Sequence, residues 1–217
     1  MAERYSLIVF DWDGTLIDSA GTIAECIQES ARDMGLPVPH KEQASHVIGL
    51  GLFDSLRLAV PQLTPERYPD FVAHYRRHFL AREDRMLMFP GIRDLLDRLS
   101  RDRRLAIATG KSRRGLDRAL AAGGLGEYFC MSRCADETHP KPHPAMLLEI
   151  MEALAVRPDR TLMIGDTSHD LNMAAAAGVD CVAVAYGAHP EHGLRACNPR
   201  TCVSSVAELD LWLSLNG

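Results

Sequence analysis

Four short, nearly continuous apolar runs are spaced along this chain. They lie at residues 7–10, 105–108, 162–164 and 182–185. Runs of this kind are typical of strands that are covered on both faces in a parallel sheet. Apolar residues at helical spacing fill the intervening segments, at residues 92–99, 146–154 and 171–177. The alternation predicts an α/β fold: a doubly wound, Rossmann-like parallel sheet with helices on both faces.

The segment at residues 19–88 breaks this alternation. It carries helical stripes at residues 23–34 and 68–79 and no convincing strand pattern. We therefore expect an inserted helical cap. The predicted domains are a core at residues 1–18 and 89–217 and a cap at residues 19–88. Because the insertion follows the first strand, whose end bears Asp11, it is placed to cover a site at that end of the sheet.

The net charge bears on the possible partners. A formal charge of −5 over 217 residues gives no global field that would attract nucleic acid or an anionic membrane. No apolar stretch approaches the roughly 20 residues of a membrane span, and the first ten residues lack the layout of a secretion signal. We expect neither nucleic acid nor a membrane as a partner.

Six cysteines without a CxxC pair predict reduced thiols in a cytoplasmic protein. Four residues, Cys130, Cys134, His139 and His143, are close enough in sequence to suggest zinc. Prolines interrupt this group, and its spacing fits no common zinc module. We interpret it as a buried strand cysteine with loop histidines.

Polar side chains follow the apolar runs where each strand ends. Asp11 and Asp13 follow the first run, Thr109 the second, and Asp166 the third. In an open parallel sheet, ligands gather beyond the carboxyl ends of the strands. Residues more than 150 positions apart are therefore expected to meet in one crevice.

Two of these carboxyl groups suit nucleophilic chemistry on a phosphate ester. Asp11 is the candidate nucleophile, which would split the reaction into two steps through an acyl phosphate. Asp13, two residues later, is the candidate acid and base: it would protonate the leaving oxygen and then take a proton from the attacking water.

A cation is expected between Asp11 and an anionic substrate, because two negative groups otherwise repel. Carboxylates are typical Mg²⁺ ligands, so we expect Mg²⁺ as the cofactor. Asp166 is the remote ligand, and Asp170 reaches the ion through water or holds a lysine. Lys141 would neutralise the remaining charge, while Thr109 and the N–H of Gly110 hold phosphate oxygens.

At these residues the chain resembles the haloacid dehalogenase superfamily of phosphohydrolases. The matching motif residues are Asp11, Trp12, Asp13, Gly14 and Thr15, then Thr109, Lys141, Asp166 and Asp170. The resemblance implies that Asp11 is the nucleophile and Asp13 the acid and base. It also implies that Mg²⁺ is bound by Asp11, the backbone carbonyl of Asp13, and Asp166, and that the partner is a small phosphorylated metabolite.

A helical cap after the first motif is similar to the phosphoglycolate phosphatase-like subgroup, in which the cap selects the substrate. Gly49 and Gly51 resemble the cap loop that faces the active site in this subgroup. Arg57 could meet a substrate carboxylate, although a solvated arginine on a helix surface is the commoner case. The implied activity is hydrolysis of a small, phosphoglycolate-like phosphate monoester.

Three alternatives remain from the sequence. A phosphomutase of the β-phosphoglucomutase type shares the aspartyl-phosphate chemistry. A signalling receiver module also groups aspartates, threonine and lysine around Mg²⁺, but needs neither a long helical insertion nor an acid two residues after the nucleophile. A non-catalytic protein that binds phosphate or metal is the third.

Overall fold

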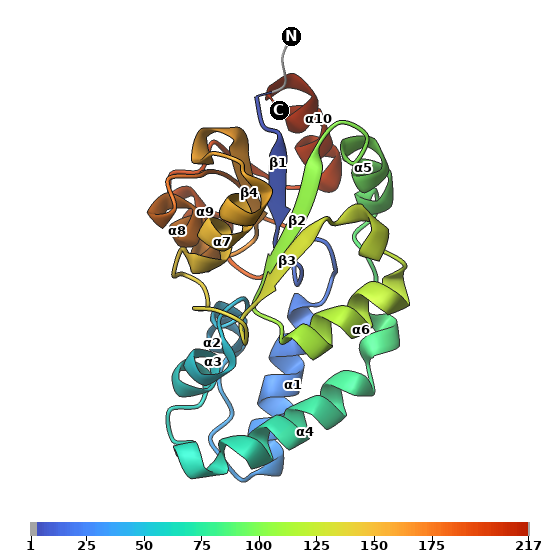
Figure 1. Ribbon diagram of the computed structural model, residues 1–217. Coiled ribbons are helices and arrows are strands. Elements are labelled where there is room, and N and C mark those ends of the chain that lie inside the picture. Colours follow the sequence, from blue (N-terminus) through green and yellow to red (C-terminus); the bar gives the residue numbers. More distant parts are fainter. Residues whose placement is uncertain (1–3, 217) are drawn as a thin grey trace.

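Six parallel strands form the centre of the computed structural model, which describes residues 4–216 (Figure 1). Their order across the sheet is β3-β2-β1-β4-β5-β6. Their bounds are β1 Leu7–Phe10, β2 Arg104–Thr109, β3 Met131–Cys134, β4 Thr161–Gly165, β5 Asp180–Val184 and β6 Thr201–Val203. The four predicted strands are present as β1, β2, β4 and β5, and all pairings are parallel. Residues 1–3 and 217, which the sequence assigns to the core domain, lie outside the described residues.

The side chains of each strand alternate between two hydrophobic layers. Ile8 and Phe10 of β1 pack into one layer, while Leu7 and Val9 pack into the other. This is the two-residue period of a strand that is covered on both faces. The helices of the first layer are α5 (Ile92–Leu99), α6 (Arg113–Gly123) and α10 (Val206–Asn216), and those of the second are α7 (Ala145–Leu154), α8 (Ser168–Ala176) and α9 (Glu191–Arg195). The predicted doubly wound α/β fold is confirmed.

Four helices occupy the stretch between β1 and α5. They are α1 (Ala20–Asp33), α2 (Lys41–His46), α3 (Leu52–Ala59) and α4 (Tyr68–Leu80). Residues 19–88 are all described and contain no strand, only these helices and two single 3₁₀ turns, Pro65–Arg67 and Glu83–Arg85. Their apolar faces, including Ile27 and Phe71, form a third buried cluster. We call residues 19–88 the helical segment.

The helical segment lies beyond the carboxyl ends of the strands, toward which the arrowheads in Figure 1 point. The chain enters and leaves it side by side, because Ile17 and Met88 form an antiparallel bridge. Two further 3₁₀ turns, Gly126–Tyr128 and Pro158–Arg160, connect core elements. Among the helices of residues 4–216, none combines the length and apolar character that crossing a bilayer requires.

Candidate active site

Three chain segments bring polar side chains to one edge of the sheet. Asp11 directly follows β1, Thr109 is the last residue of β2, and Asp166 directly follows β4. All three are buried, at 0% or 1% exposure. Because β1 lies between β2 and β4, these strand ends are neighbours. The structure thus brings together residues that the sequence places far apart.

Lys141 joins two of the buried carboxylates. Its Nζ lies 2.6 Å from Asp11 Oδ1 and 2.6 Å from Asp170 Oδ1. The lysine side chain is fully buried, which is tolerated only when an ammonium group is paired. The sequence left two roles open for Asp170, reaching the ion through water or holding a lysine. The geometry shows that Asp170 holds Lys141.

Asp170 is fixed by the first turn of α8. The N–H of Thr167 donates to Asp170 Oδ2 over 3.1 Å, and the N–H of Asp170 faces Thr167 Oγ1 at 3.3 Å, so the two residues form a capping box. Gly165 has to be glycine for this arrangement, since a Cβ there would lie 2.4 Å from Asp170 Cβ. The remaining oxygen, Oδ1, is the one that contacts Lys141.

Asp166 is held on both carboxylate oxygens. Thr15 Oγ1 donates to its Oδ1 over 2.8 Å, and the N–H of Ala188 donates to its Oδ2 over 2.7 Å. Two glycines make room for it: a Cβ on Gly14, whose φ is +82°, or on Gly187 would lie 2.2 Å from Asp166 Oδ2. The Asp166 carboxylate therefore has one well-defined position at the site.

The carboxylates of Asp11, Asp166 and Asp170 form a group whose ligand atoms lie within 4.8 Å of one another. Burial raises the pKa of Asp11 well above its ordinary value, against the attraction of Lys141. Burial and the neighbouring Asp170 raise the pKa of Asp166 to about 7. Burial alone would lower the pKa of Lys141, but the two aspartates outweigh it and raise that pKa. These shifts favour the protonated forms of Asp11 and Asp166, because the three ionised carboxylates would carry more negative charge than Lys141 can balance.

A divalent cation fits this donor set. Three carboxylates and one ammonium group carry a formal charge of −2. Asp11 Oδ2 is buried without a hydrogen-bond partner among the described residues. Three buried carboxylates whose oxygens lie this close together, with one ammonium group to offset their charge, suit a hard cation, which prefers oxygen donors.

Asp13 lies beside this group and has different partners. Ser19 Oγ donates to its Oδ1 over 2.7 Å, and Lys111 Nζ lies 3.0 Å from its Oδ2. The sequence did not predict either contact, and Lys111 was not among the candidate site residues. Its position could have indicated a role, because Lys111 is a cation two residues past the strand end at Thr109.

The helical segment touches the core at the expected phosphate-binding turn. Thr109 Oγ1 accepts a hydrogen bond from the N–H of Lys111, over 3.2 Å. A Cβ on Gly110 would lie 2.7 Å from the carbonyl oxygen of Gly49, and one on Gly51 would lie 2.9 Å from Pro140 Cβ. The structure thus brings Gly49 and Gly51 to the contact between the helical segment and the core.

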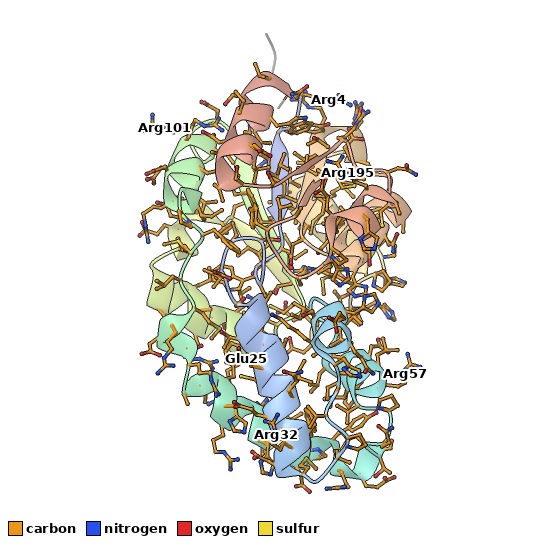
Figure 2. The ribbon with its side chains drawn as sticks, turned by 180° about the vertical axis from the view of Figure 1, so that it is seen from behind. Arg4, Glu25, Arg32, Arg57, Arg101 and Arg195 are labelled. Carbon is orange, nitrogen blue, oxygen red and sulfur yellow. The ribbon has the colours of Figure 1, made fainter. Side chains whose placement is uncertain are left out.

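Arg57 does not reach this contact. It pairs with Asp54 on its own helix over 2.9 Å, with 70% of its side chain exposed. It points away from the molecule in Figure 2. The expectation that Arg57 faces a substrate carboxylate is therefore not supported by its position.

Three histidines form a second contact between the helical segment and the core. Nε2 of His169 and Nε2 of His189 lie 2.7 and 3.1 Å from the carbonyl oxygen of His46. Ser168 N–H donates to His189 Nδ1, so the proton of the neutral ring is on Nε2. Burial and the neighbouring His169 lower the pKa of His189 to about 4, so this ring is neutral at physiological pH. His169, whose role the sequence does not indicate, therefore helps to anchor α2.

A cavity of about 430 Å³ extends from Asp11 and Asp13 into the helical segment. Its wall includes Lys111 and Gly49 as well as apolar side chains from α1, α3, α4 and the loop that follows α2. A volume of this size is within the range of small-molecule sites. The carboxylate group therefore opens into a space that can hold a ligand.

The family model for haloacid dehalogenase-like hydrolases matches residues 8–184, which include Asp11, Thr109, Lys141 and Asp166. The chain belongs to this family. The prediction of a haloacid dehalogenase-type hydrolase is confirmed.

The curated relatives of this haloacid dehalogenase-like hydrolase have several activities in their names. The probable phosphatase IndB of Dickeya dadantii is 35% identical over 94% of this chain and 91% of that protein. The pyrophosphatase PpaX of Halalkalibacterium halodurans is 31% identical over 93% of this chain and 94% of that protein. A phosphoglycolate phosphatase of Photorhabdus laumondii is 28% identical over 93% of this chain and 89% of that protein.

Solved structures agree with this assignment. A haloacid dehalogenase-like hydrolase from Bacteroides fragilis superposes with a TM-score of 0.85 at 25% identity, over 94% of this chain and 99% of that one. A structure from Bacteroides vulgatus, named as a β-phosphoglucomutase, has a TM-score of 0.84 at 19% identity, over 98% of this chain and 88% of that one. The second likeness shows the fold alone.

Proposed function

We propose that this chain is a Mg²⁺-dependent phosphatase that hydrolyses a small phosphate monoester through an aspartyl-phosphate on Asp11. One observation carries the proposal. Asp11 Oδ2 is buried without a hydrogen-bond partner among the described residues, while Lys141 contacts Oδ1 and two other carboxylates lie close by. A carboxylate oxygen left free in this way can act as a nucleophile. The phosphatase names of the relatives support the same activity.

In the first step, Asp11 Oδ2 attacks phosphorus and the bond from phosphorus to the ester oxygen breaks. Asp13 gives its proton to the departing alkoxide, which leaves as an alcohol. The ammonium group of Lys141 and the turn at Thr109 and Gly110 hold the charge of the transferring phosphoryl group. Asp13 is suited to this role because it borders the cavity that would contain the alcohol.

In the second step, a water molecule attacks phosphorus of the aspartyl-phosphate. Asp13 takes a proton from that water, the bond between Asp11 and phosphorus breaks, and inorganic phosphate leaves. Asp11, the backbone carbonyl of Asp13, and Asp166 would bind Mg²⁺, with Asp170 holding Lys141. The ion supplies positive charge that offsets the repulsion between Asp11 and the phosphate.

The test is release of phosphate from p-nitrophenyl phosphate with Mg²⁺ and with a chelator. We expect Mg²⁺-dependent turnover that Asp11→Asn abolishes. Asp18→Asn is the matched control, because Asp18 is an exposed aspartate seven residues along the same loop. Acid quenching during turnover, followed by mass spectrometry, should find a phosphoryl group on Asp11.

Other results would indicate the alternatives. Full activity of Asp11→Asn would exclude the proposed nucleophile. Turnover that requires a sugar bisphosphate would indicate a phosphomutase. Binding of phosphate or Mg²⁺ without any turnover would indicate a non-catalytic protein.

A further inference from the structure

We infer that the substrate is a phosphate monoester with an apolar, uncharged leaving group, longer than the two-carbon acid of phosphoglycolate. This inference rests on the proposed phosphatase activity. It comes from the lining of the cavity that extends from Asp11 and Asp13 into the helical segment.

The inner wall of the cavity is formed by the hydrophobic cluster of the helical segment. Ile27 of α1, Leu56 of α3 and Phe71 of α4 line it, and these side chains are only 6%, 4% and 0% exposed. They are buried and yet border the cavity, so apolar atoms form this side of the space next to the two aspartates. An apolar group entering this space leaves water, which is favourable roughly in proportion to its area.

Apart from the exposed Arg76, the polar groups on this wall are few and neutral. Ser55 donates its hydroxyl to the carbonyl oxygen of Val47, so it is already engaged. Tyr75 stacks on Phe79 with ring centroids 5.7 Å apart, and burial raises the pKa of Tyr75, so the phenol stays uncharged. The wall thus offers a flat, aromatic surface and no buried charge.

The cations of the cavity lie toward the core side and the outer edge. Lys111 pairs with Asp13, and Arg118 pairs with Glu83 over 2.8 Å. Arg114 and Arg76 are exposed, and Arg76 is the single charged residue that the helical segment contributes to the lining. Lys111 is the nearly buried cation of this lining, and it is already paired with Asp13. A leaving group with its own carboxylate would therefore enter an apolar space without an unpaired buried cation among the described lining residues, which is costly. The positive charge of Lys111, beside Asp13 on the core side, instead suits the phosphoryl end of the substrate.

The size of the cavity also favours a leaving group longer than that of phosphoglycolate. About 430 Å³ is far more than the two carbons of phosphoglycolate need, and a small acid would leave apolar wall in contact with trapped water. An alkyl chain or an aromatic ring would fill it. The wall therefore selects by apolar area, not by charge.

The wild-type enzyme tests this with a series of n-alkyl phosphates, from ethyl to hexyl, whose leaving groups differ little in reactivity. With Mg²⁺ present, we expect kcat/KM for phosphate release to rise about two- to fourfold with each added methylene. Phosphoglycolate and inorganic pyrophosphate should be poorer substrates than butyl phosphate.

Two neighbouring positions on α4 provide a matched pair of variants. Val72 lines the cavity, whereas Ala73 is exposed and outside the lining. Val72→Lys should lower kcat/KM for hexyl phosphate at least about tenfold more than for ethyl phosphate, because it places a charge in the apolar wall. Ala73→Lys adds the same charge to the same helix and should leave the alkyl series as in the wild type.

The outcomes separate this inference from the proposed function. Equal kcat/KM across the alkyl series, or a preference for phosphoglycolate or pyrophosphate, would overturn the inference while the phosphatase activity stood. Absence of turnover with every ester would overturn the proposed function and this inference with it. If kcat/KM rises with alkyl chain length in the wild type and this rise is lost in Val72→Lys, both the inference and the proposed function are supported.

Discussion

Lys111 Nζ lies 3.0 Å from Asp13 Oδ2, and both side chains are nearly buried, at 13% and 12% exposure. The same Nζ lies 4.9 Å from the ring centroid of Phe79 on α4. One lysine of the core therefore contacts both the proposed acid and base and the aromatic wall of the helical segment. Its position couples the proposed chemistry to the part of the cavity where the leaving group would lie.

We predict that Lys111→Met lowers both activity and stability. Asp13 would lose a charged partner in a mostly buried place, which costs about 1–3 kcal/mol of unfolding free energy. The anionic substrate would lose a nearby cation, so kcat/KM should fall at least about tenfold. Urea unfolding and steady-state kinetics measure the two effects. Lys41→Met is the control, because Lys41 is exposed at the start of α2; equal behaviour of the two variants would contradict the prediction.

The layers of the fold could be predicted because their sequence signals are local. An apolar run such as residues 162–164 is recognisable as a strand covered on both faces, and β4 has that environment. The edge strands β3 and β6 lack such runs. Ser132 and Arg133 interrupt β3, and β6 has three residues, so neither gives a pattern that differs from a loop.

The site residues that directly follow strands could be predicted from the sequence. Those whose position depends on the packing of loops could not. Asp11 and Asp166 follow strands, and the parallel sheet alone brings them together. Gly187 was not predicted, because its closeness to Asp166 arises from a loop after β5 whose path no local pattern gives. For Arg57 the sequence left two readings, and the structure has the solvated one: Leu56 and Ala59 form the buried side of α3, and Arg57 is exposed.

We predict that stability without Mg²⁺ falls as the pH rises from about 4 to about 7. Burial raises the pKa of Asp11, and burial with Asp170 raises that of Asp166 to about 7. A carboxyl group with a raised pKa in the folded state binds more protons there than in the unfolded chain, whose carboxyl pKa is about 3.9. Unfolding free energy therefore decreases with pH across this window.

Mg²⁺ should reverse this loss, because it replaces the protons as the source of positive charge. At about a hundred times its dissociation constant it would add about 2.7 kcal/mol, which corresponds to a Tm increase of about 5–10 °C at about pH 8. The increase should be much smaller at about pH 5, where protons compete with the ion. Thermal unfolding with Mg²⁺ or a chelator measures it. Asp166→Asn should abolish the increase, and an increase that is independent of pH would contradict the prediction.

We predict that Gly187→Ala strongly reduces activity. Its new Cβ would lie 2.2 Å from Asp166 Oδ2, so the carboxylate or the loop must move. Asp166 would lose its position toward Asp11 and with it much of its affinity for Mg²⁺, so kcat should fall about a hundredfold and more Mg²⁺ should be needed. Gly193→Ala is the matched control, because nothing lies within 4 Å of a Cβ there. A variant with unchanged kcat and unchanged Mg²⁺ requirement would show that Asp166 is free to shift.

The last prediction concerns the anchoring of α2 by two histidines. His169 and His189 both contact the carbonyl oxygen of His46, over 2.7 and 3.1 Å, so removing one donor leaves the other. We expect each alanine variant to lose about 1 kcal/mol of unfolding free energy, and the double variant to lose more than the sum by about 0.5–1 kcal/mol, because the carbonyl then loses both contacts. Urea unfolding of the wild type, both single variants and the double variant gives this coupling energy. His192→Ala, at an exposed histidine of α9, should have little effect. Strictly additive losses would mean that the two rings stabilise α2 independently and do not share the carbonyl.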